Sequence, residues 1–334
     1  MCYQNIEFHT VTAHFLLGVT TEKKSKYFLT GKVLAGYGSF FTVLYKKSLF
    51  SCTLRGKFRR ISREEHNPIA VGDRVKFSRI DDTSGVIEEL LPRKNKISRP
   101  TKWGPVKERI FASNVDQIVA VVSTKDPRFT TGLIDRMLLV AERENLKGII
   151  CINKIDLIDV HEIDNSITAY RKLRYVVVPM SAKTGAGIRD MKSLLQNKFS
   201  VFIGQSGVGK SSILNRLDPG LNLRVQEISM YSNKGRHTTS SVTAVPLSFG
   251  GVIADTPGFR DFGLWGIDQN EVCGLFREFR RYTSQCKYQP CFHVHEPKCS
   301  VKTAYEKGRI TSWRYENYVR IFDSFTEPAS YGQR

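Results

Sequence analysis

The chain has 334 residues, of which 41% are hydrophobic and 25% charged, a composition typical of soluble globular domains. That length favours two or three domains over one. No apolar run approaches the roughly 18 residues of a membrane span, and residues 1–26 lack the basic start and long apolar core of a signal peptide. We therefore expect a cytoplasmic protein with a poorly ordered N-terminal extension and no membrane partner.

The charge of the chain is strongly positive and clustered. Lys and Arg number 51 against 32 Asp and Glu, a formal net charge of +19. Residues 54–63 and 92–109 are dense in Lys and Arg, and the second stretch also holds Trp103. Clustered cations follow a phosphate backbone, and an aromatic ring can stack on an unpaired base. The pattern favours a nucleic-acid partner over a surface that is basic only for solubility.

Residues 27–97 have the pattern of a small all-β unit. Short strand-like runs, beginning with YFLTGKVLAGYGSFFTVLY, are separated by Gly, Asp and Ser turns. Such a segment suits a closed barrel of the oligonucleotide-binding (OB) type, with its basic loop directed at nucleic acid. The alternative is a barrel that serves only as a spacer, and the clustered charge argues against it.

From about residue 114 the pattern changes to alternating strands and helices. VDQIVAVVST, KGIICINKID and RYVVVPMSAK are near-continuous apolar runs, as expected of parallel strands covered on both faces. Stretches with helical spacing, such as GLIDRMLLVAEREN, separate them. SVTAVPLSF and VIADTPGF then form a predicted hairpin around Gly250 and Gly251. This order predicts an α/β sheet with functional loops at the strand ends, followed after residue 265 by short helices.

GQSGVGKSS, residues 204–212, has the pattern of a phosphate-binding loop between a strand and a helix. Gly204, Gly207 and Gly209 allow several backbone N–H groups to converge on one anion. Lys210 is expected to reach the terminal phosphates and the Ser211 hydroxyl to ligate Mg²⁺. The other residues of this loop predicted to contact the nucleotide are Gln205, Ser206, Val208 and Ser212.

The segment NKID, at the end of a buried strand, predicts which base is bound. We expect Asn153 to bond the O6 side of a purine, the Lys154 stem to lie along the base, and the Asp156 carboxylate to accept from N1–H and the 2-amino group. Guanine offers that pair of donors and adenine does not, so a P-loop kinase or ATPase is disfavoured. The next strand ends in a segment expected to close over the guanine edge: Ser181, Ala182 and Lys183.

Two further segments are expected to sense the γ-phosphate. In DTPG, residues 255–258, Asp255 is predicted to hold Mg²⁺ through water and the Gly258 N–H to meet the γ-phosphate. GRHTTS, residues 235–240, lies between this segment and the phosphate loop. Thr238 or Thr239 is expected to reach Mg²⁺, and the spacing does not choose between them.

The order of these elements is base, base, phosphate, switch, switch, whereas a GTPase usually begins with the phosphate loop. A sheet cut before VDQIVAVV, with its old ends joined between LLQNK and FSVFI, has this order. Domain termini usually lie close together, so the rearrangement can leave the site intact. The sequence thus predicts a circularly permuted GTPase domain.

CKYQPCFHVHEPKCS, residues 286–300, contains Cys286, Cys291, His293 and Cys299. Three thiolates and one imidazole form a closed tetrahedral zinc site of the structural kind, so a zinc hydrolase is not expected. His295 is an alternative fourth ligand, and reduced cysteines in a core are the alternative to a metal. An odd total of 7 cysteines argues against a disulfide framework. The metal would stabilise a short helical domain with little core of its own.

Taken together, these features resemble the RsgA (YjeQ) family of small-ribosomal-subunit biogenesis GTPases over residues 30–325. The resemblance is carried by LRGKFR, NKID, GQSGVGKSS, GRHTT, DTPGFRDFGLW and the Cys/His spacing, which favours His293 over His295. We therefore expect a multidomain chain: an OB-type β-barrel (27–97), a circularly permuted α/β P-loop GTPase domain (98–265) and a C-terminal helical zinc-binding domain (266–334), preceded by an N-terminal extension (1–26) that lies outside the resemblance.

The resemblance also implies an activity and partners. The protein would bind the small (30S) ribosomal subunit and 16S rRNA, assist late 30S maturation, and hydrolyse GTP to GDP and phosphate with ribosome stimulation. It would use GTP, Mg²⁺ and one structural Zn²⁺, act as a monomer, and meet other assembly factors. The alternatives are an RNA-binding scaffold that uses GTP as an occupancy switch, and a translation or signalling GTPase, against which the barrel, the permuted order and the zinc cluster argue.

Phe259 follows the DTPG glycine, where Ras-like proteins place the glutamine that orients the attacking water. Because a phenyl ring makes no hydrogen bond of this kind, we expect slow intrinsic hydrolysis. The resemblance assigns the task to His237, whose neutral imidazole can accept a proton, and the alternative is a structural role for this histidine. Lys210 and Gly258 complete the predicted catalytic set. Since the chain runs from DTPGFRDF into the C-terminal domain, we expect that domain to change its pose between GTP and GDP states.

Overall fold

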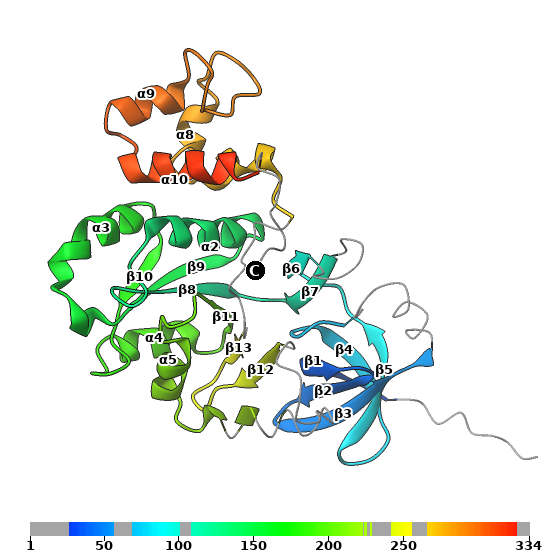
Figure 1. The fold of residues 1–334 in the computed structure, drawn as a ribbon. Helices are drawn as coiled ribbons and strands as arrows, with labels where there is room; N and C mark the ends of the chain where they lie inside the picture. Colours follow the sequence, from blue (N-terminus) through cyan, green and yellow to red (C-terminus); the bar gives the residue numbers. More distant parts are fainter. Residues whose placement is uncertain are drawn as a thin grey trace, which may run out of the picture.

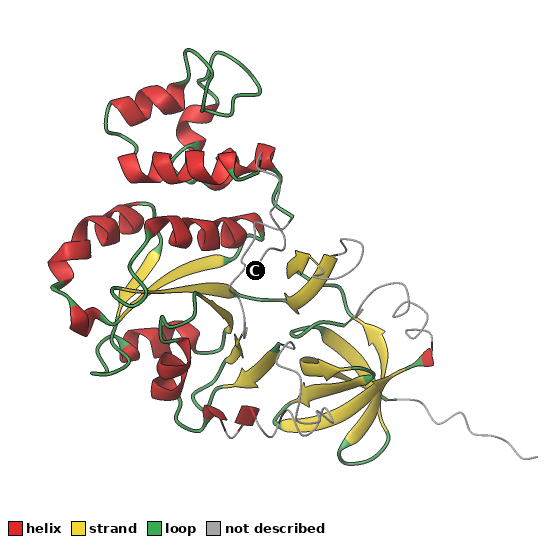
Figure 2. Cartoon of the chain, viewed as in Figure 1, coloured by secondary structure: helices red, strands yellow, loops and turns green. Residues whose placement is uncertain are grey.

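The structure is a computed structural model that describes residues 27–56, 69–100, 108–222, 224–225, 228, 242–255 and 266–325. A β-barrel, a sheet flanked by helices and a helical C-terminal region follow one another along the chain (Figures 1 and 2). Among the described residues, no helix is long and apolar enough to cross a membrane.

The N-terminal strands close into a barrel in the order β1-β2-β3-β5-β4. These strands are β1 (Phe28–Tyr37), β2 (Phe40–Tyr45), β3 (Ser48–Leu54), β4 (Arg74–Arg79) and β5 (Ser84–Leu90). β3 pairs with β5 in parallel and the other pairs are antiparallel, the arrangement of an OB fold. Alternate residues point inward, so that Phe41, Val43, Phe77 and Ile87 fill the barrel. The predicted barrel is confirmed.

A two-stranded hairpin of β6 (Lys96–Pro100) and β7 (Glu108–Ser113) connects the barrel to the sheet. The buried Asp73 carboxylate accepts hydrogen bonds from the Arg93 side chain at 2.7 Å and the Ser113 hydroxyl at 2.5 Å. Without these donors a buried carboxylate would be costly, so the network fixes the barrel on the hairpin. The boundary predicted at residues 97 and 98 falls inside β6, and the domain limits stay a prediction.

The central sheet has six strands in the order β10-β9-β8-β11-β13-β12. Its strands are β8 (Gln117–Ser123), β9 (Lys147–Asn153), β10 (Val176–Pro179), β11 (Phe199–Ile203), β12 (Thr243–Pro246) and β13 (Val252–Asp255). All neighbours are parallel except the β12–β13 pair. Every residue of β8 and β11 is buried, as their continuous apolar sequences predict.

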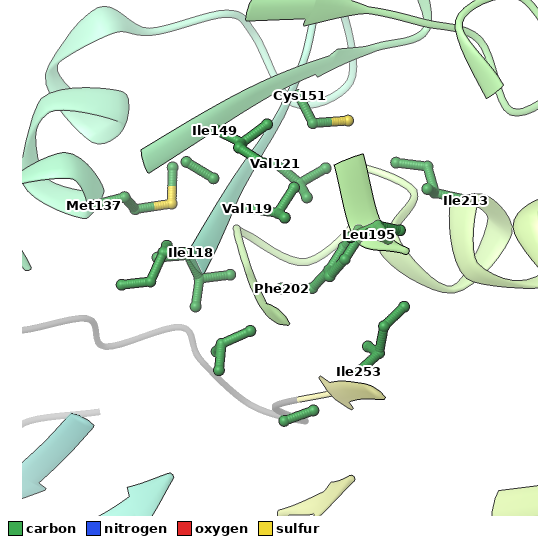
Figure 3. Packing of buried hydrophobic residues seen from close by; sticks show 14 of the residues in the cluster. Ile118, Val119, Val121, Met137, Ile149, Cys151, Leu195, Phe202, Ile213 and Ile253 are labelled. Atoms are coloured by element: carbon green, nitrogen blue, oxygen red, sulfur yellow. The ribbon is translucent and has the colours of Figure 1, made fainter. Parts of the chain in front are cut away.

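Helices cover both faces of this sheet (Figure 1). They are α2 (Thr131–Arg143), α3 (Asp164–Lys172), α4 (Ile188–Leu195) and α5 (Lys210–Leu217), with short 3-10 turns η1 (Ile155–Leu157) and η2 (Val160–Ile163). Figure 3 shows Met137 of α2 on one side of Val119 and Val121, and Leu195 and Ile213 on the other.

The permuted order of the GTPase domain is visible at the centre of the sheet. β8 opens the domain in sequence, yet it pairs with β11, the strand that leads into the phosphate loop. α4 ends at Leu195 and β11 begins at Phe199, so residues 196–198 make the join predicted between LLQNK and FSVFI. The predicted circular permutation is confirmed.

The C-terminal region is helical, as predicted, and packs against α2. It contains η3 (Gln269–Glu271), α7 (Val272–Leu275), α8 (Arg280–Thr283), α9 (Ser300–Glu306) and α10 (Ser312–Asp323). Its small core joins the aromatic rings of Phe276, Phe279 and Tyr318 to three buried cysteines, and Leu139 of α2 belongs to the same cluster.

Candidate nucleotide site and metal centre

The phosphate loop lies between β11, which ends at Ile203, and α5, which begins at Lys210. Two of its glycines are required by their surroundings. A Cβ on Gly204 would lie 2.2 Å from the Val121 carbonyl oxygen. Gly209 has φ +92°, and a Cβ there would lie 2.4 Å from Asn153 Nδ2. The loop can therefore curl tightly beneath the N-terminus of α5, where free N–H groups favour an anion.

The phosphate loop carries one cation, Lys210, and several exposed polar side chains. Lys210 Nζ donates to the carbonyl oxygens of Gly204 at 2.6 Å and Gln205 at 2.9 Å, so the ammonium lies within the curve of the loop. Val208 is buried beneath it, whereas Gln205, Ser206, Ser211 and Ser212 are exposed. A phosphate held by the loop would therefore meet one cation and exposed hydroxyl groups, the donor set of a nucleotide phosphate site.

Asn153, the last residue of β9, joins the phosphate loop to the predicted base-binding segments. It is only 2% exposed. Its Nδ2 donates to the Val208 carbonyl oxygen at 2.8 Å, and its Oδ1 accepts from the Ala182 N–H at 3.1 Å. Both ends of the amide thus make contacts within the protein. The contact predicted between Asn153 and guanine O6 stays a prediction.

Asp156 and Ser181 form the polar edge of the predicted base site. The Ser181 hydroxyl donates to Asp156 Oδ1 at 2.6 Å and accepts from the Thr184 N–H at 3.1 Å. This hydrogen bond is the main cause that lowers the pKa of Asp156, and the nearby cations Lys183 and Lys154 act in the same direction. The exposed carboxylate is therefore ionised at neutral pH and can accept two further donors, as guanine recognition requires.

A segment that carries no sequence motif, residues 124–127, also belongs to this site. The Thr124 hydroxyl donates to the Lys154 carbonyl oxygen at 2.6 Å, and Lys154 Nζ donates to the Asp126 carbonyl oxygen. A Cβ added to Gly207 in the phosphate loop would lie 3.6 Å from Pro127 Cδ, so the two segments run close together. Sequence reasoning missed these residues, and their place after a buried parallel strand was the only available signal.

The predicted γ-phosphate sensors are placed only in part. Asp255 ends β13, next to the strand that leads into the phosphate loop, with its backbone paired to Phe202. His237, Thr238, Thr239 and Gly258 lie outside the described residues. Their roles stay predictions.

The four residues predicted to bind metal come together in the C-terminal region. Cys286, Cys291, His293 and Cys299 are all buried, and their ligand atoms lie within 4.8 Å of one another. His293 Nδ1 is 3.6 Å from Cys286 Sγ and 3.3 Å from Cys299 Sγ, and those two sulfurs are 3.9 Å apart. His295 is exposed and lies outside the cluster, so the structure separates the two candidate histidines.

The distances among Cys286, His293 and Cys299 fit a tetrahedral zinc ion. With Zn–S near 2.3 Å and Zn–N near 2.0 Å, ligand atoms are about 3.5 to 3.8 Å apart. Burial lowers the pKa of His293, which favours the neutral imidazole that binds metals. Burial also raises the pKa of the Cys291 thiol to about 12, so a thiolate at this position requires a cation nearby.

The local chain is shaped to form this cluster. His293 has φ +60°, which reverses the chain after Cys291. The Glu296 carboxylate accepts from the backbone N–H groups of Phe292 at 2.5 Å and Val294 at 3.1 Å, and thereby holds the turn. The Tyr315 hydroxyl of α10 donates to the His293 carbonyl oxygen at 2.7 Å. Such contacts behind the ligands orient them before a metal binds.

Comparison with known proteins identifies the family. The family model described as RsgA GTPase matches residues 90–265, and the one described as RsgA N-terminal domain matches residues 30–87. The chain belongs to the RsgA family. A protein of Caldanaerobacter subterraneus subsp. tengcongensis named small ribosomal subunit biogenesis GTPase RsgA is 38% identical over 90% of this chain and 96% of its own length. The protein of the same name from Thermotoga maritima is 42% identical over 81% of this chain and 87% of its own.

Solved structures agree with this membership. The crystal structure of YjeQ from Thermotoga maritima superposes with a TM-score of 0.75 at 37% identity, covering 92% of this chain and 100% of that one. YloQ, described as a circularly permuted GTPase, gives a TM-score of 0.70 at 32% identity, covering 92% of this chain and 98% of its own. As an RsgA family GTPase, the protein is a GTP-hydrolysing enzyme, and its phosphate-loop and base-binding motifs meet around Gly209, Asn153 and Asp156.

Proposed function

We propose that this protein is a GTPase of small-ribosomal-subunit biogenesis, which binds the 30S subunit and 16S rRNA late in maturation and hydrolyses GTP there. The observation that carries the proposal is the Asp156–Ser181 pair, whose exposed carboxylate suits the donors of a guanine edge, in a chain whose relatives are named for this role. The net charge of +19 suits an RNA partner. We infer a monomer that works in the cytoplasm, alongside other assembly factors.

The residues divide the work by position. Asp156 accepts from the guanine edge, Lys183 and Ala182 flank it, and Lys154 covers the base. Lys210 neutralises the terminal phosphates, while Ser211, Asp255 and either Thr238 or Thr239 hold Mg²⁺, which offsets charge on the phosphate oxygens. The Gly258 N–H meets the γ-phosphate. His237 positions the water that attacks it, since Phe259 cannot.

The Cys286, Cys291, His293 and Cys299 cluster holds one structural Zn²⁺ in this proposal. The support is the set of ligand distances and the burial of all four side chains. Four protein ligands fill a tetrahedral site, so the metal takes no part in hydrolysis and instead stabilises a region with a small core.

GTP turnover tests the proposal most directly. The purified protein is assayed alone and with small subunits, large subunits and bare RNA, beside a His237→Ala variant and a His295→Ala control. Strong stimulation by small subunits only, lost in His237→Ala and kept in His295→Ala, is the expected result. No stimulation by any of them would contradict the ribosomal role and favour the scaffold alternative, to which the absence of a glutamine after Gly258 lends some weight.

A further inference from the structure

Helix α10 of the C-terminal region contacts the first turn of α2 through Asn317. Asn317 Nδ2 donates to the Thr131 hydroxyl oxygen at 3.0 Å and to Asp135 Oδ2 at 2.7 Å. Asn317 is 4% exposed. The two helices approach closely at Gly132, where an added Cβ would lie only 3.3 Å from Asn317 Oδ1. The contact is therefore a close, partly buried hydrogen bond between two residues 186 positions apart in the chain.

A buried ionic network surrounds this hydrogen bond. The Arg314 guanidinium of α10 binds Asp135 of α2, and its Nε donates to Glu278 at 2.6 Å. The Tyr170 hydroxyl of α3 donates to Asp135 at 2.6 Å. Burial opposes a charge on Arg314, but the two carboxylates outweigh it and hold the pKa of Arg314 well above its usual value. The first turn of α2 is thus held by α3 and α10 together.

That same turn is continuous with the nucleotide site. The chain enters α2 from residues 124–127, which make hydrogen bonds with Lys154 of the base-binding segment and pass close to the phosphate loop, since a Cβ added to Gly207 would lie 3.6 Å from Pro127 Cδ. The Ser123 hydroxyl donates to the Pro127 carbonyl oxygen at 2.8 Å, which holds this short segment in a compact form. Only a few residues separate Pro127 from Thr131, so the two sets of contacts constrain one stretch of backbone.

The other end of α2 provides a natural comparison. Glu142 binds Arg277 at 2.6 Å and Arg280 at 2.9 Å, so a second pair of cations docks the C-terminal region there. Arg277 also donates to the Leu173 carbonyl oxygen at the end of α3. At the rise of a helix, Glu142 is about 16 Å from Thr131 along the axis. This second contact holds the same two parts of the protein without approaching the nucleotide motifs.

We propose that Asn317 is a positioning residue for the nucleotide site: by holding Thr131, it keeps residues 124–130 against the phosphate loop and Lys154. The inference rests on the proposed function, in that it takes the site to bind guanine nucleotides. Nucleotide affinity then depends on how α10 is docked. Because such coupling is reciprocal, bound nucleotide also tightens the α2–α10 contact.

The test measures the affinity of the full-length protein for a fluorescent GDP analogue. Asn317→Ala and Thr131→Val are expected to weaken binding about 5- to 20-fold. Thr131→Ser keeps the hydroxyl and should bind the analogue as tightly as the wild-type protein. Arg277→Gln loosens the contact at the far end of α2 and should leave the affinity unchanged. In turnover, Asn317→Ala should raise KM for GTP at nearly constant kcat, because the groups that act on the γ-phosphate are retained.

Hydrogen exchange supplies a second measurement. Amides of residues 124–130 should exchange faster in Asn317→Ala than in Arg277→Gln. If wild-type protein fails to bind the analogue, the proposed function is wrong. If it binds, and Asn317→Ala and Thr131→Val bind equally tightly, the positioning role is overturned. A loss in Arg277→Gln as large as in Asn317→Ala would also overturn it, since docking in general would then be responsible.

Discussion

An Arg314→Met substitution is expected to destabilise the C-terminal region and its contact with α2. The Arg314 side chain is 3% exposed and lies between Asp135, which is fully buried, and Glu278, which is 9% exposed. Methionine fills a similar volume but leaves both carboxylates without their cation. Breaking a buried ion pair costs about 3 to 5 kcal/mol. Tyr170 and Asn317 still donate to Asp135, so we expect about 3 kcal/mol.

This loss should depend on pH. Burial raises the pKa of the Asp135 carboxyl in the intact protein and the Arg314 cation opposes this, so loss of Arg314 raises that pKa further above its value in the unfolded chain. The folded variant then binds more protons than the unfolded chain, and its stability rises as the pH falls. Arg314→Met should therefore be less destabilising near pH 5 than near pH 8.

Urea unfolding followed by the fluorescence of Trp313 measures the effect. Trp313 packs against Tyr170, with ring centroids 5.2 Å apart, and Trp103→Phe with Trp265→Phe would make it the single reporter. With a slope of about 2 kcal/mol per molar urea, the midpoint should fall by about 1.5 M. Combining Arg314→Met with Asp135→Asn and Glu278→Gln should recover most of the loss. A midpoint change under about 0.3 M, or no recovery in the triple variant, would refute the reasoning.

Four further changes test the nucleotide and metal sites. In Gly209→Ala the new Cβ would lie 2.4 Å from Asn153, so GDP binding measured by calorimetry should weaken at least ~10-fold. The loss should be smaller in Gly207→Ala, where the nearest atom to the new Cβ is 3.6 Å away. Equal losses in the two variants would argue against the clash with Asn153. Asp156→Asn should lower GTP affinity about 10- to 100-fold. It should improve binding of xanthosine triphosphate, because xanthine has an acceptor oxygen in place of the 2-amino donor and the asparagine amide can donate to it. Unchanged selectivity between the two nucleotides would exclude Asp156 from base recognition. Ser181→Ala removes the main cause of the lowered pKa of Asp156, so the acid limb of a nucleotide-binding pH profile should move to higher pH; an unmoved limb would show that another group titrates there. Cys291→Ser should release zinc, measured by metal analysis, and expose the C-terminal region to protease, whereas His295→Ala should retain the metal; retention by both would contradict the ligand set.

The sequence predicted the architecture well because its strongest signals are local. Residues of β3 alternate between buried and more exposed positions, as in a barrel strand with one face inward. The continuous apolar runs of β8 and β11 form strands that are buried on both faces. The Cys/His cluster was also predictable, since a turn of few residues limits where its ligands can lie. The permuted order followed from motif order alone, because the contacts of a sheet do not depend on where the chain is cut.

Contacts between distant segments could not be predicted in this way. Residues 124–127 carry no motif. They meet Lys154 through the Thr124 hydroxyl and through the Asp126 carbonyl oxygen, a backbone group that any residue could supply. Asn153 is assigned to the base by its place in NKID, which gives no sign of its hydrogen bonds with the Val208 carbonyl oxygen and the Ala182 N–H. Arg314 and Asn317 lie in a helix that reads as an ordinary amphipathic segment. Only the packing of α10 on α2 shows that these polar groups are buried.

The permutation gives the C-terminal region two connections to the nucleotide site. By sequence it follows β13, whose last residue, Asp255, begins the predicted γ-phosphate sensor. By packing it is docked on α2. This helix covers β8 and β9, and β9 leads into the predicted base-binding segment NKID. A change of pose driven through the first connection must therefore either break the buried Arg314–Asp135 contact or carry α2 with it. In the second case, a partner bound to the C-terminal region would affect the phosphate-binding and base-binding segments together. The factor by which this partner changes nucleotide affinity would then equal the factor by which the nucleotide changes the affinity for the partner.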